Sequence, residues 1–269
     1  MTGAAGGGSM RSNPVRARWA AGQVAANLWV DIGWPVTVEG LARLNYDSFT
    51  VDLQHSLIDR AALVPVLQAL SLGQGAPLVR VSQNDPSEIA FVLDAGAYGV
   101  ILPTVETAAQ CRDFVAACLY PPAGVRSWGP LRGLLYGGSD YFDGCGREIL
   151  KIALIETARG MENLDEIAAT PGLDMIYLGP NDLGISYGAK PSYTPNHPKV
   201  DEAIDRVAEA ARRHRLVAGM HTATAPVARR AIDRGYRFVS LGYAAKVMFA
   251  AVAGLRDEVF DPTGGDRNG

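Results

Sequence analysis

The stretch KIALIETARGMENLDEIAATPGLDMIYLGPNDL, residues 151–183, decides the fold. It contains two short apolar runs, Ile152–Ile155 and Met175–Leu178, on either side of a segment with helical period at Asn163–Ala169. Near-continuous apolar runs are typical of parallel strands that helices cover on both faces. The stretch therefore predicts one strand–helix–strand unit of a parallel sheet.

The same alternation runs along the chain and gives eight units. An open doubly wound sheet usually has about five or six strands, whereas eight units in about 250 residues are typical of a closed barrel. The sequence therefore predicts an α/β fold, the (β/α)8 TIM barrel. The expected strands are Val24–Val30, Ser48–Gln54, Leu78–Val81, Gly99–Leu102, Ile152–Ile155, Met175–Leu178, Val217–Met220 and Phe238–Leu241. The expected helices are Asp59–Leu72, Pro86–Ala95, Thr107–Leu119, Asn163–Ala169, Val200–Arg213 and Ala225–Arg234.

The remaining segments are expected to be tails and one long loop. Residues 120–146 are rich in Gly, Pro and aromatic side chains, which predicts an extended loop on the barrel. The start, MTGAAGGGSM, lacks the charged front and apolar middle of a secretory signal. We expect a flexible tail at residues 1–20, with Met10 as an alternative start, one barrel domain at 21–260 and a second tail at 261–269.

The composition excludes several classes of protein. Apolar residues make up 48% and charged residues 20% of the chain, as in globular proteins. The formal charge of −3 provides no field that would attract nucleic acid or an anionic membrane, and no apolar run reaches the roughly 18 residues of a membrane span. Three cysteines form no disulfide framework and fit a reducing compartment. We expect a cytoplasmic protein that binds neither nucleic acid nor membranes.

Polar residues close six of the expected strands. In a barrel of this kind, chemistry takes place at the C-terminal ends of the strands, so these residues are the first candidates for a functional site. They are His55, Arg80, Pro103 with Thr104, Glu156 with Thr157, Asn181 with Asp182, and His221 with Thr222.

Glu156 and Asp182 end adjacent strands, so their carboxylates are expected to lie close together. Two carboxylates at short range repel each other, and a shared proton or a cation resolves the conflict. Hard divalent ions accept few protein carboxylates and leave positions for water and substrate oxygens. A surface glutamate and a helix-capping aspartate are the alternative for isolated residues, but placement at adjacent strand ends favours a metal site.

Four further residues have a functional and a structural interpretation. Asp52 and His55 are three residues apart, and a carboxylate at that spacing can orient an imidazole for acid–base work, although a lone histidine is more often structural. Arg80 lies inside an apolar strand and needs an anion to face, which favours recognition of a carboxylate. His221 is either a third metal ligand or a polar residue of the pocket wall, and we favour the wall.

Other kinds of chemistry have little support. The sequence contains no GxSxG motif, and no cysteine lies at a strand end. A Schiff-base aldolase needs a lysine near the C-terminal end of a strand, and Lys151, Lys190, Lys199 and Lys246 all lie elsewhere. The turns after the last two strands lack the glycine-rich phosphate cradle that is usual there.

These residues, in this order, resemble the HpcH/HpaI aldolase family, the metal-dependent class II aldolases that cleave 4-hydroxy-2-oxo acids to pyruvate and an aldehyde. The resemblance extends from about Val24 to Met248, and its GPxDL and PPxGxR motifs are specific together. The matching stretches are DLQHS from residue 52, PLVRV from 77, NDP with LDAGAYGVILP within 84–103, YPPAGVRSWGP from 120, LIET from 154 and NLDEIAATPGLDMIYLGPNDL from 163.

The resemblance implies a metal and a charge partner for the reaction. Glu156 and Asp182 are implied as ligands of a divalent ion, Mg²⁺, Mn²⁺ or Co²⁺. Arg80 is implied to neutralise the pyruvate enolate. The turn Gly179–Pro180–Asn181 is implied to hold the pyruvate carboxylate through backbone amides around Asn181 and Asp182.

The resemblance also implies an acid–base residue and an assembly. His55 is implied as the acid/base, oriented by Asp52 and by Asp94 of a neighbouring subunit. The family is typically a hexamer, a trimer of dimers, in which the last helix packs on a partner subunit.

The chain departs from the family pattern at several places. This chain has Gln54 where many members have Glu, and Ser56 where they have Gly or Ala. Leu154 stands where a glutamine is frequent, and GYAAK, which contains Tyr243, stands where Gly-Ser-Asp is usual. These changes leave the aldehyde unidentified.

Two rival functions stay open. One is a CoA-ester lyase of the citrate lyase type, for which the basic residues 212–215 make a poor phosphate site, and the other is a non-catalytic barrel that binds a 2-oxo acid.

Overall fold

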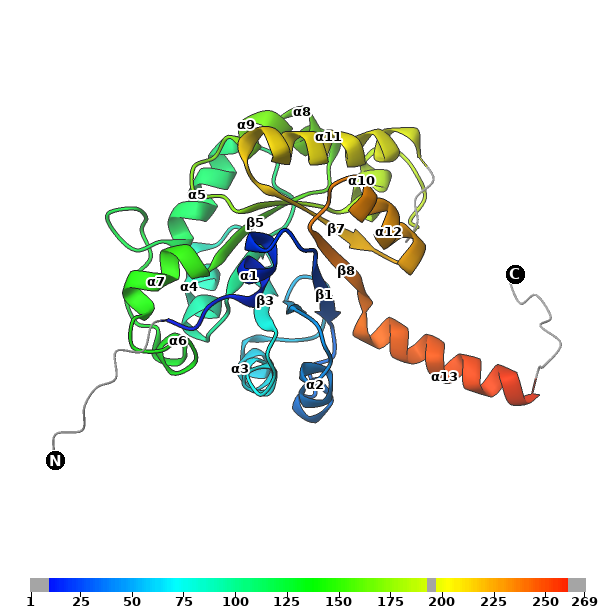
Figure 1. Ribbon diagram of the computed structural model, residues 1–269, viewed down its shortest axis with the longest axis horizontal. Helices are drawn as coiled ribbons and strands as arrows, with labels where there is room; N and C mark the ends of the chain where they lie inside the picture. Colours follow the sequence, from blue (N-terminus) through cyan, green and yellow to red (C-terminus); the bar gives the residue numbers. More distant parts are fainter. Residues whose placement is uncertain (1–9, 193–196, 261–269) are drawn as a thin grey trace.

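Eight parallel strands close into a barrel in the order of the sequence. The computed structural model describes residues 10–192 and 197–260, shown in Figure 1. The predicted (β/α)8 TIM barrel is confirmed. The strands are β1 (Ala25–Val30), β2 (Ser48–Asp52), β3 (Ala76–Arg80), β4 (Gly99–Leu102), β5 (Leu150–Ile155), β6 (Met175–Leu178), β7 (Val217–Thr222) and β8 (Phe238–Tyr243).

Helices surround the barrel, as Figure 1 shows. Six of them were expected from the sequence, within one to two residues at each end, because their apolar residues recur at helical spacing. The helices are α1 (Pro14–Ala20), α2 (Pro35–Ala42), α3 (Arg60–Leu70), α4 (Pro86–Asp94), α5 (Ala108–Cys118), α6 (Leu131–Gly137), α7 (Tyr141–Glu148), α8 (Ala158–Glu162), α9 (Leu164–Ala168), α10 (Pro180–Ser186), α11 (Pro198–His214), α12 (Ala225–Asp233) and α13 (Ala244–Phe260).

The barrel interior contains a connected polar layer. Asn27 on β1 donates to Ser240 Oγ on β8 at 2.8 Å and accepts from Ser48 and Thr50 on β2, each at 2.9 Å. Tyr177 on β6 donates to Ser240 Oγ at 2.7 Å. All of these side chains are buried, so every bond is shielded from water and ties strands together across the barrel.

Close packing beside Tyr177 requires a glycine on β7. A Cβ built on Gly219 would lie 2.5 Å from Met175 Sδ and 2.8 Å from Tyr177 Cδ2. Real carbon contacts are longer than this, so a larger residue would displace the tyrosine ring. Gly219 therefore fixes the direction in which the Tyr177 hydroxyl points.

The predicted tail at residues 1–20 is wrong for residues 10–20. Met10 is buried, and Asn13 caps α1 and donates to the carbonyl oxygens of Tyr98 at 3.1 Å and Glu148 at 2.9 Å. Trp19 Nε1 donates to the Arg237 carbonyl oxygen at 3.0 Å. These partners precede β4, β5 and β8, so α1 lies across the N-terminal end of the barrel. The predicted tails at 1–9 and 261–269 fall outside the described residues.

The predicted extended loop at residues 120–146 is also wrong, because it contains α6 and the start of α7. Tyr141 is fully buried, and its hydroxyl accepts from Arg126 at 3.1 Å. The Tyr136 ring packs edge-on against Tyr98 at 5.0 Å. The composition of this segment is typical of a loop, but its aromatic side chains pack on the barrel. The segment therefore forms short helices.

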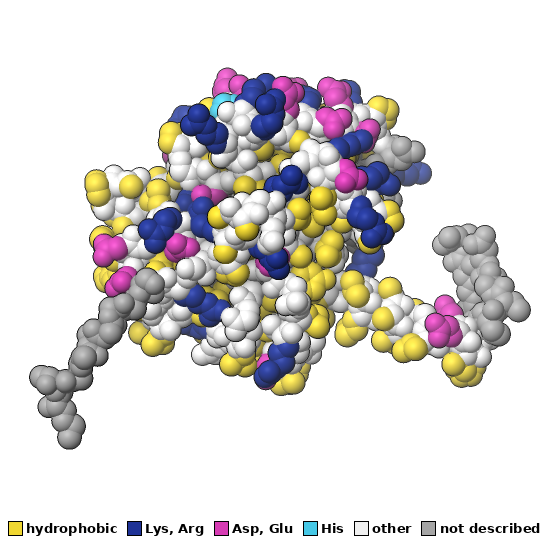
Figure 2. All heavy atoms as spheres, viewed as in Figure 1, with side chains coloured by type: hydrophobic (Ala, Val, Ile, Leu, Met, Phe, Trp, Pro, Cys, Tyr) yellow, Lys and Arg dark blue, Asp and Glu magenta, His cyan; other side chains and the backbone are white. Residues whose placement is uncertain are grey.

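Helix α13 leaves the barrel and projects from it, as Figure 1 shows. Apolar side chains lie along its exposed length and are visible in Figure 2. They are Val247, Met248, Phe249, Val252, Leu255, Val259 and Phe260, each 44% to 71% exposed. An apolar surface of this kind on a long helix is typical of a protein contact site. No helix in residues 10–192 and 197–260 combines the length and the apolar character needed to cross a membrane.

Candidate active site

A small pocket that opens to solvent, with a cavity volume of about 20 Å³, lies at the C-terminal end of the barrel. Its lining comes from strand ends and from the start of α10, as expected for this fold. The lining residues are Trp29, Arg80, Leu154, Glu156, Tyr177, Gly179, Pro180, Asn181, Asp182, His221 and Tyr243. The structure thus brings six of the predicted site residues together: Arg80, Glu156, Gly179, Pro180, Asn181 and Asp182.

Glu156 and Asp182 face the same pocket. Glu156 follows β5 and is only 5% exposed, whereas Asp182 lies in the first turn of α10 and is exposed. Burial, and after it the negative charge of Asp182, raise the pKa of Glu156 to about 7 against the opposing effects of Arg80 and Thr104. A positive charge placed between the two carboxylates would offset the free-energy cost of ionising Glu156.

Thr104 holds the Glu156 carboxylate in place. Its backbone N–H donates to Glu156 Oε1 at 2.9 Å, and its hydroxyl donates to the same oxygen at 3.2 Å. Thr104 has a φ of 52°, which is a strained conformation for a β-branched residue. Backbone strain of this kind persists where the surrounding structure fixes a functional group.

The pocket floor can hold a hard divalent cation. A Cβ on Gly179 would lie 2.8 Å from Glu156 Oε2, so glycine leaves the space beside that oxygen open. Asn181 Oδ1 is buried and accepts no hydrogen bond from any described residue. Glu156, Asp182 and Asn181 together offer the carboxylate and amide oxygens that Mg²⁺ and Mn²⁺ accept as ligands. These residues therefore fit the ion that the sequence predicts.

Arg80 has an anionic partner within the chain. Its Nε donates to Asp52 Oδ1 at 2.9 Å and its Nη2 to Asp52 Oδ2 at 2.6 Å, and both side chains are almost fully buried. The guanidinium carbon lies 4.5 Å from the centre of the Trp29 ring. Two parallel hydrogen bonds and one aromatic face therefore fix the direction of this positive charge.

The predicted role of Asp52 needs correction. The carboxylate oxygen Oδ1 accepts from the backbone N–H groups of Gln54 at 3.0 Å and His55 at 3.3 Å, while the carboxylate as a whole pairs with Arg80. Asp52 thus positions the arginine and shapes the turn, and it does not orient the His55 ring. His55 is exposed and lies on the turn after β2, outside the residues that line the pocket.

Asp94 also lies outside the pocket of its own chain. It ends α4, and its Oδ1 accepts from Arg126 Nη2 at 2.7 Å. The Asp94 side chain is 31% exposed, so part of the carboxylate faces outward.

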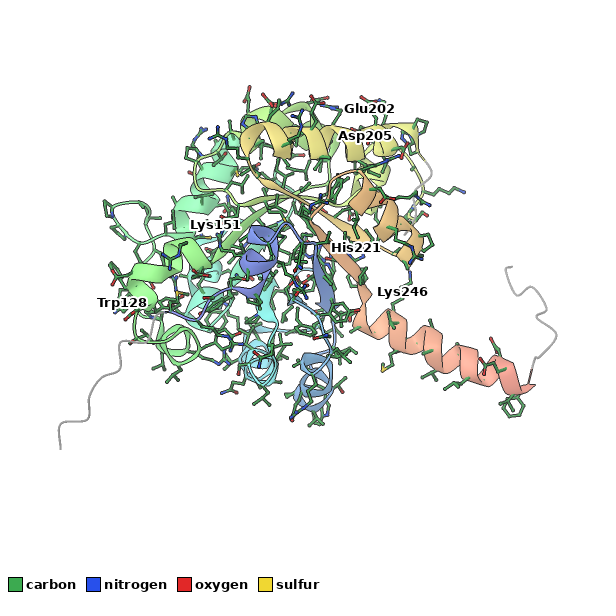
Figure 3. All side chains as sticks on the ribbon, in the orientation of Figure 1. Trp128, Lys151, Glu202, Asp205, His221 and Lys246 are labelled. Atoms are coloured by element: carbon green, nitrogen blue, oxygen red, sulfur yellow. The ribbon has the colours of Figure 1, made fainter. Side chains whose placement is uncertain are left out.

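His221 stands in the pocket wall, as the sequence analysis favours. It is 7% exposed, lies 5.8 Å from the Trp29 ring and 4.7 Å from the Tyr243 ring, and is labelled in Figure 3 near Lys246 and the start of α13. Burial, together with the positive charges of Arg80 and Lys246, lowers its pKa to about 4 against the opposing effect of Asp52. Within the described residues no group of three or more His, Cys, Asp or Glu could hold a metal, so His221 does not join the acid pair.

Trp29 and Tyr177 line the pocket although the sequence analysis does not single them out. Trp29 Nε1 donates to the Tyr177 hydroxyl at 3.2 Å, which connects the pocket to the polar layer inside the barrel. Both are aromatic residues in largely apolar strands, so only their position one residue before the strand end marks them as pocket residues.

The fold and the pocket define a (β/α)8 barrel protein with a carboxylate pair at its C-terminal mouth. The family model described as HpcH/HpaI aldolase/citrate lyase matches residues 26–251. The chain therefore belongs to the HpcH/HpaI aldolase/citrate lyase family, as its motifs suggest.

Three proteins illustrate the similarity. The hydroxypyruvate/pyruvate aldolase of Rhizorhabdus wittichii is 38% identical over 228 residues, which are 85% of this chain and 91% of the relative. The 5-keto-4-deoxy-D-glucarate aldolase of Klebsiella pneumoniae is 34% identical over 247 residues, 91% of this chain and 96% of the relative. The crystal structure of an HpcH/HpaI aldolase/citrate lyase family protein from Burkholderia cenocepacia has a TM-score of 0.85 at 27% identity and covers 92% of this chain and 99% of its own.

We expect Asp52→Ala to lower the free energy of unfolding by about 3–5 kcal/mol, because it leaves the buried Arg80 charge without a partner. Urea denaturation measures the change. Glu39→Ala is the control, since it breaks the exposed pair with Arg43 and should cost at most about 1 kcal/mol. Equal losses in the two variants would contradict the structural role of Asp52.

Proposed function

We propose that the protein is a divalent-metal-dependent class II aldolase, which reversibly cleaves a 4-hydroxy-2-oxo acid to pyruvate and an aldehyde. The observation that supports this most is the buried Glu156 carboxylate beside Asp182, in a pocket that also contains the fixed charge of Arg80. The similar proteins named above as aldolases support a carbon–carbon lyase. The three cysteines are free and buried, which fits a cytoplasmic location.

The proposed metal ligands are Glu156 and Asp182, with Mg²⁺, Mn²⁺ or Co²⁺ as the ion. When bound, the ion supplies Lewis-acid polarisation of the substrate carbonyl. The backbone amides of Asn181 and Asp182, at the end of the Gly179–Pro180 turn, hold the substrate carboxylate.

Arg80 is the proposed partner of the negative charge that develops on the carbonyl oxygen when the C3–C4 bond breaks. Its contacts with Asp52 and Trp29 exist before substrate binds, so its charge needs no reorganisation during the reaction. Arg80 is itself buried, and charges fixed in advance at buried positions are among the largest contributions to catalysis.

His55 is the proposed acid/base, which takes the proton from the C4 hydroxyl directly or through water. Its turn follows β2 and therefore lies at the same end of the barrel as the pocket. We propose that Asp94 of a neighbouring subunit reaches this histidine through the part of its carboxylate that faces outward.

Turnover is tested by coupling pyruvate release from a 4-hydroxy-2-oxo acid to lactate dehydrogenase, with Mn²⁺ present. EDTA and Glu156→Ala should each remove both activity and Mn²⁺ binding. Arg80→Lys keeps the charge but loses the paired geometry, and it should lower kcat about 10²- to 10³-fold while Mn²⁺ still binds.

Glu106→Gln is the matched control for turnover, because it removes a carboxylate that pairs with Arg159 outside the pocket. It should leave the rate unchanged. No pyruvate from any of several substrates with any metal would favour a non-catalytic binding barrel. Tight binding of acetyl-CoA in calorimetry, without pyruvate binding, would favour the citrate lyase type.

We expect Mn²⁺ binding to weaken as the pH falls through about 7. The Glu156 carboxyl is protonated below its raised pKa, and a proton then competes with the metal for this ligand. The dissociation constant should increase about fivefold between pH 7 and pH 6, and about tenfold for each further pH unit below that, as measured by electron paramagnetic resonance of free Mn²⁺. An affinity that stays constant between pH 8 and pH 5.5 would exclude Glu156 as a ligand.

We propose a homo-oligomer, of the hexameric kind, in which α13 packs on a neighbouring subunit. The apolar side chains exposed along α13 support this contact. Phe249→Asp combined with Val252→Asp places two charges on adjacent turns of that surface and should yield a smaller species in sedimentation velocity. Glu258→Gln, near the end of the same helix, should not change the mass, and a monomeric wild-type protein would refute the assembly.

A further inference from the structure

His221 has two ring nitrogens without a protein partner. Nδ1 and Nε2 are both buried and form no hydrogen bond with any residue in the described parts of the chain. Buried polar atoms in native proteins almost always have a partner. The unpaired nitrogens therefore indicate a ligand group that enters the pocket beside this ring.

The orientation of His221 follows from the strand. Gly219 faces the barrel interior, where Tyr177 and Phe238 occupy the space of its missing side chain. Side chains two residues apart on a strand point to the same side, so His221 faces inward one layer nearer the mouth. Trp29 and Tyr243 pack against the ring and keep it in place.

The chemistry of the ring limits what it can recognise. Burial and the nearby positive charges of Arg80 and Lys246 keep the imidazole neutral, so it offers one donor and one acceptor. A carboxylate or an enolate oxygen accepts only, and Arg80 already serves that need. A hydroxyl group both donates and accepts, so it can bond the ring nitrogen that faces the pocket whether that nitrogen carries the proton or not.

We propose that His221 is a specificity-determining residue that hydrogen-bonds a hydroxyl group on C3 of the 2-oxo acid, so that the protein prefers a 3-hydroxy-2-oxo acid to the unsubstituted acid as the aldol donor. The inference rests on the proposed aldolase function, which places the 2-oxo acid group between Arg80 and the acid pair. The atom next to that group is C3, and His221 is part of the same pocket wall as Arg80 and Trp29. The aldehyde enters from the open mouth.

The test compares hydroxypyruvate with pyruvate as the donor, each with the same aldehyde that has no hydroxyl group. His221→Phe keeps an aromatic ring but removes both nitrogens. We expect it to lower kcat/KM for hydroxypyruvate about 10- to 100-fold and to change kcat/KM for pyruvate less than about threefold. His221→Gln restores one donor and one acceptor and should recover part of the preference.

Calorimetry measures how tightly hydroxypyruvate and pyruvate bind to the Mn²⁺-loaded protein. The ratio of the two dissociation constants reports the same preference without turnover. It therefore tests His221 even if the aldolase activity is absent. Thermal unfolding checks that the variants fold, and His221→Leu replaces the phenylalanine variant if that one does not.

Three results would overturn the proposal. The first is an equal loss for both donors in His221→Phe, which would mean that the ring only supports the pocket. The second is an unchanged ratio of the two dissociation constants. The third is a loss that appears only with hydroxylated aldehydes, which would place the recognised hydroxyl on the other substrate.

Discussion

Electrostatic repulsion between two carboxylates is the constraint around which the pocket is built. Glu156 is buried beside Asp182, and both burial and the neighbouring charge disfavour its ionised form. The surroundings hold the carboxylate in this position: Thr104 adopts a strained backbone to bond one oxygen, and Gly179 leaves room beside the other. An unfavourable arrangement of this kind persists only because the closed barrel fixes it from several sides.

Arg80 brings a positive charge to the pocket without forming an ion pair with Glu156 or Asp182 among the described residues. Arg80 forms its close contacts with Asp52 and Trp29, and its positive charge acts on Glu156 through space, where it lowers the pKa of that carboxyl. Trp29 in turn is bonded to Tyr177, whose hydroxyl reaches the polar layer at Ser240. The position of the arginine is thus connected, bond by bond, to the middle of the barrel.

The barrel could be predicted from the sequence because each strand is marked by residues that are adjacent in the chain. Buried parallel strands appear as apolar runs, and the residue after each run marks the mouth. The pairing of Asp52 with Arg80 is not visible in the same way, since the two residues are 28 positions apart and meet only because β2 and β3 align them side by side. The spacing of Asp52 and His55 is local, and it brings the carboxylate to the backbone N–H of His55 rather than to its ring.

The missed helices have a similar explanation. Short segments such as α1 and α6 have little helical period of their own, and they form because Asn13 and Tyr136 find partners far along the chain. The pocket residue His221 was visible as a strand-end histidine, but its unpaired nitrogens appear only when the strands around it are in place.

Strand β8 ends at Tyr243 and α13 begins at the next residue, so one uninterrupted piece of backbone joins the ring beside His221 to the projecting helix. Asp31 accepts from the Ala245 N–H at 2.9 Å and anchors this junction to the loop after β1. Whatever surface α13 contacts is therefore separated from the cavity wall at Tyr243 by no intervening loop.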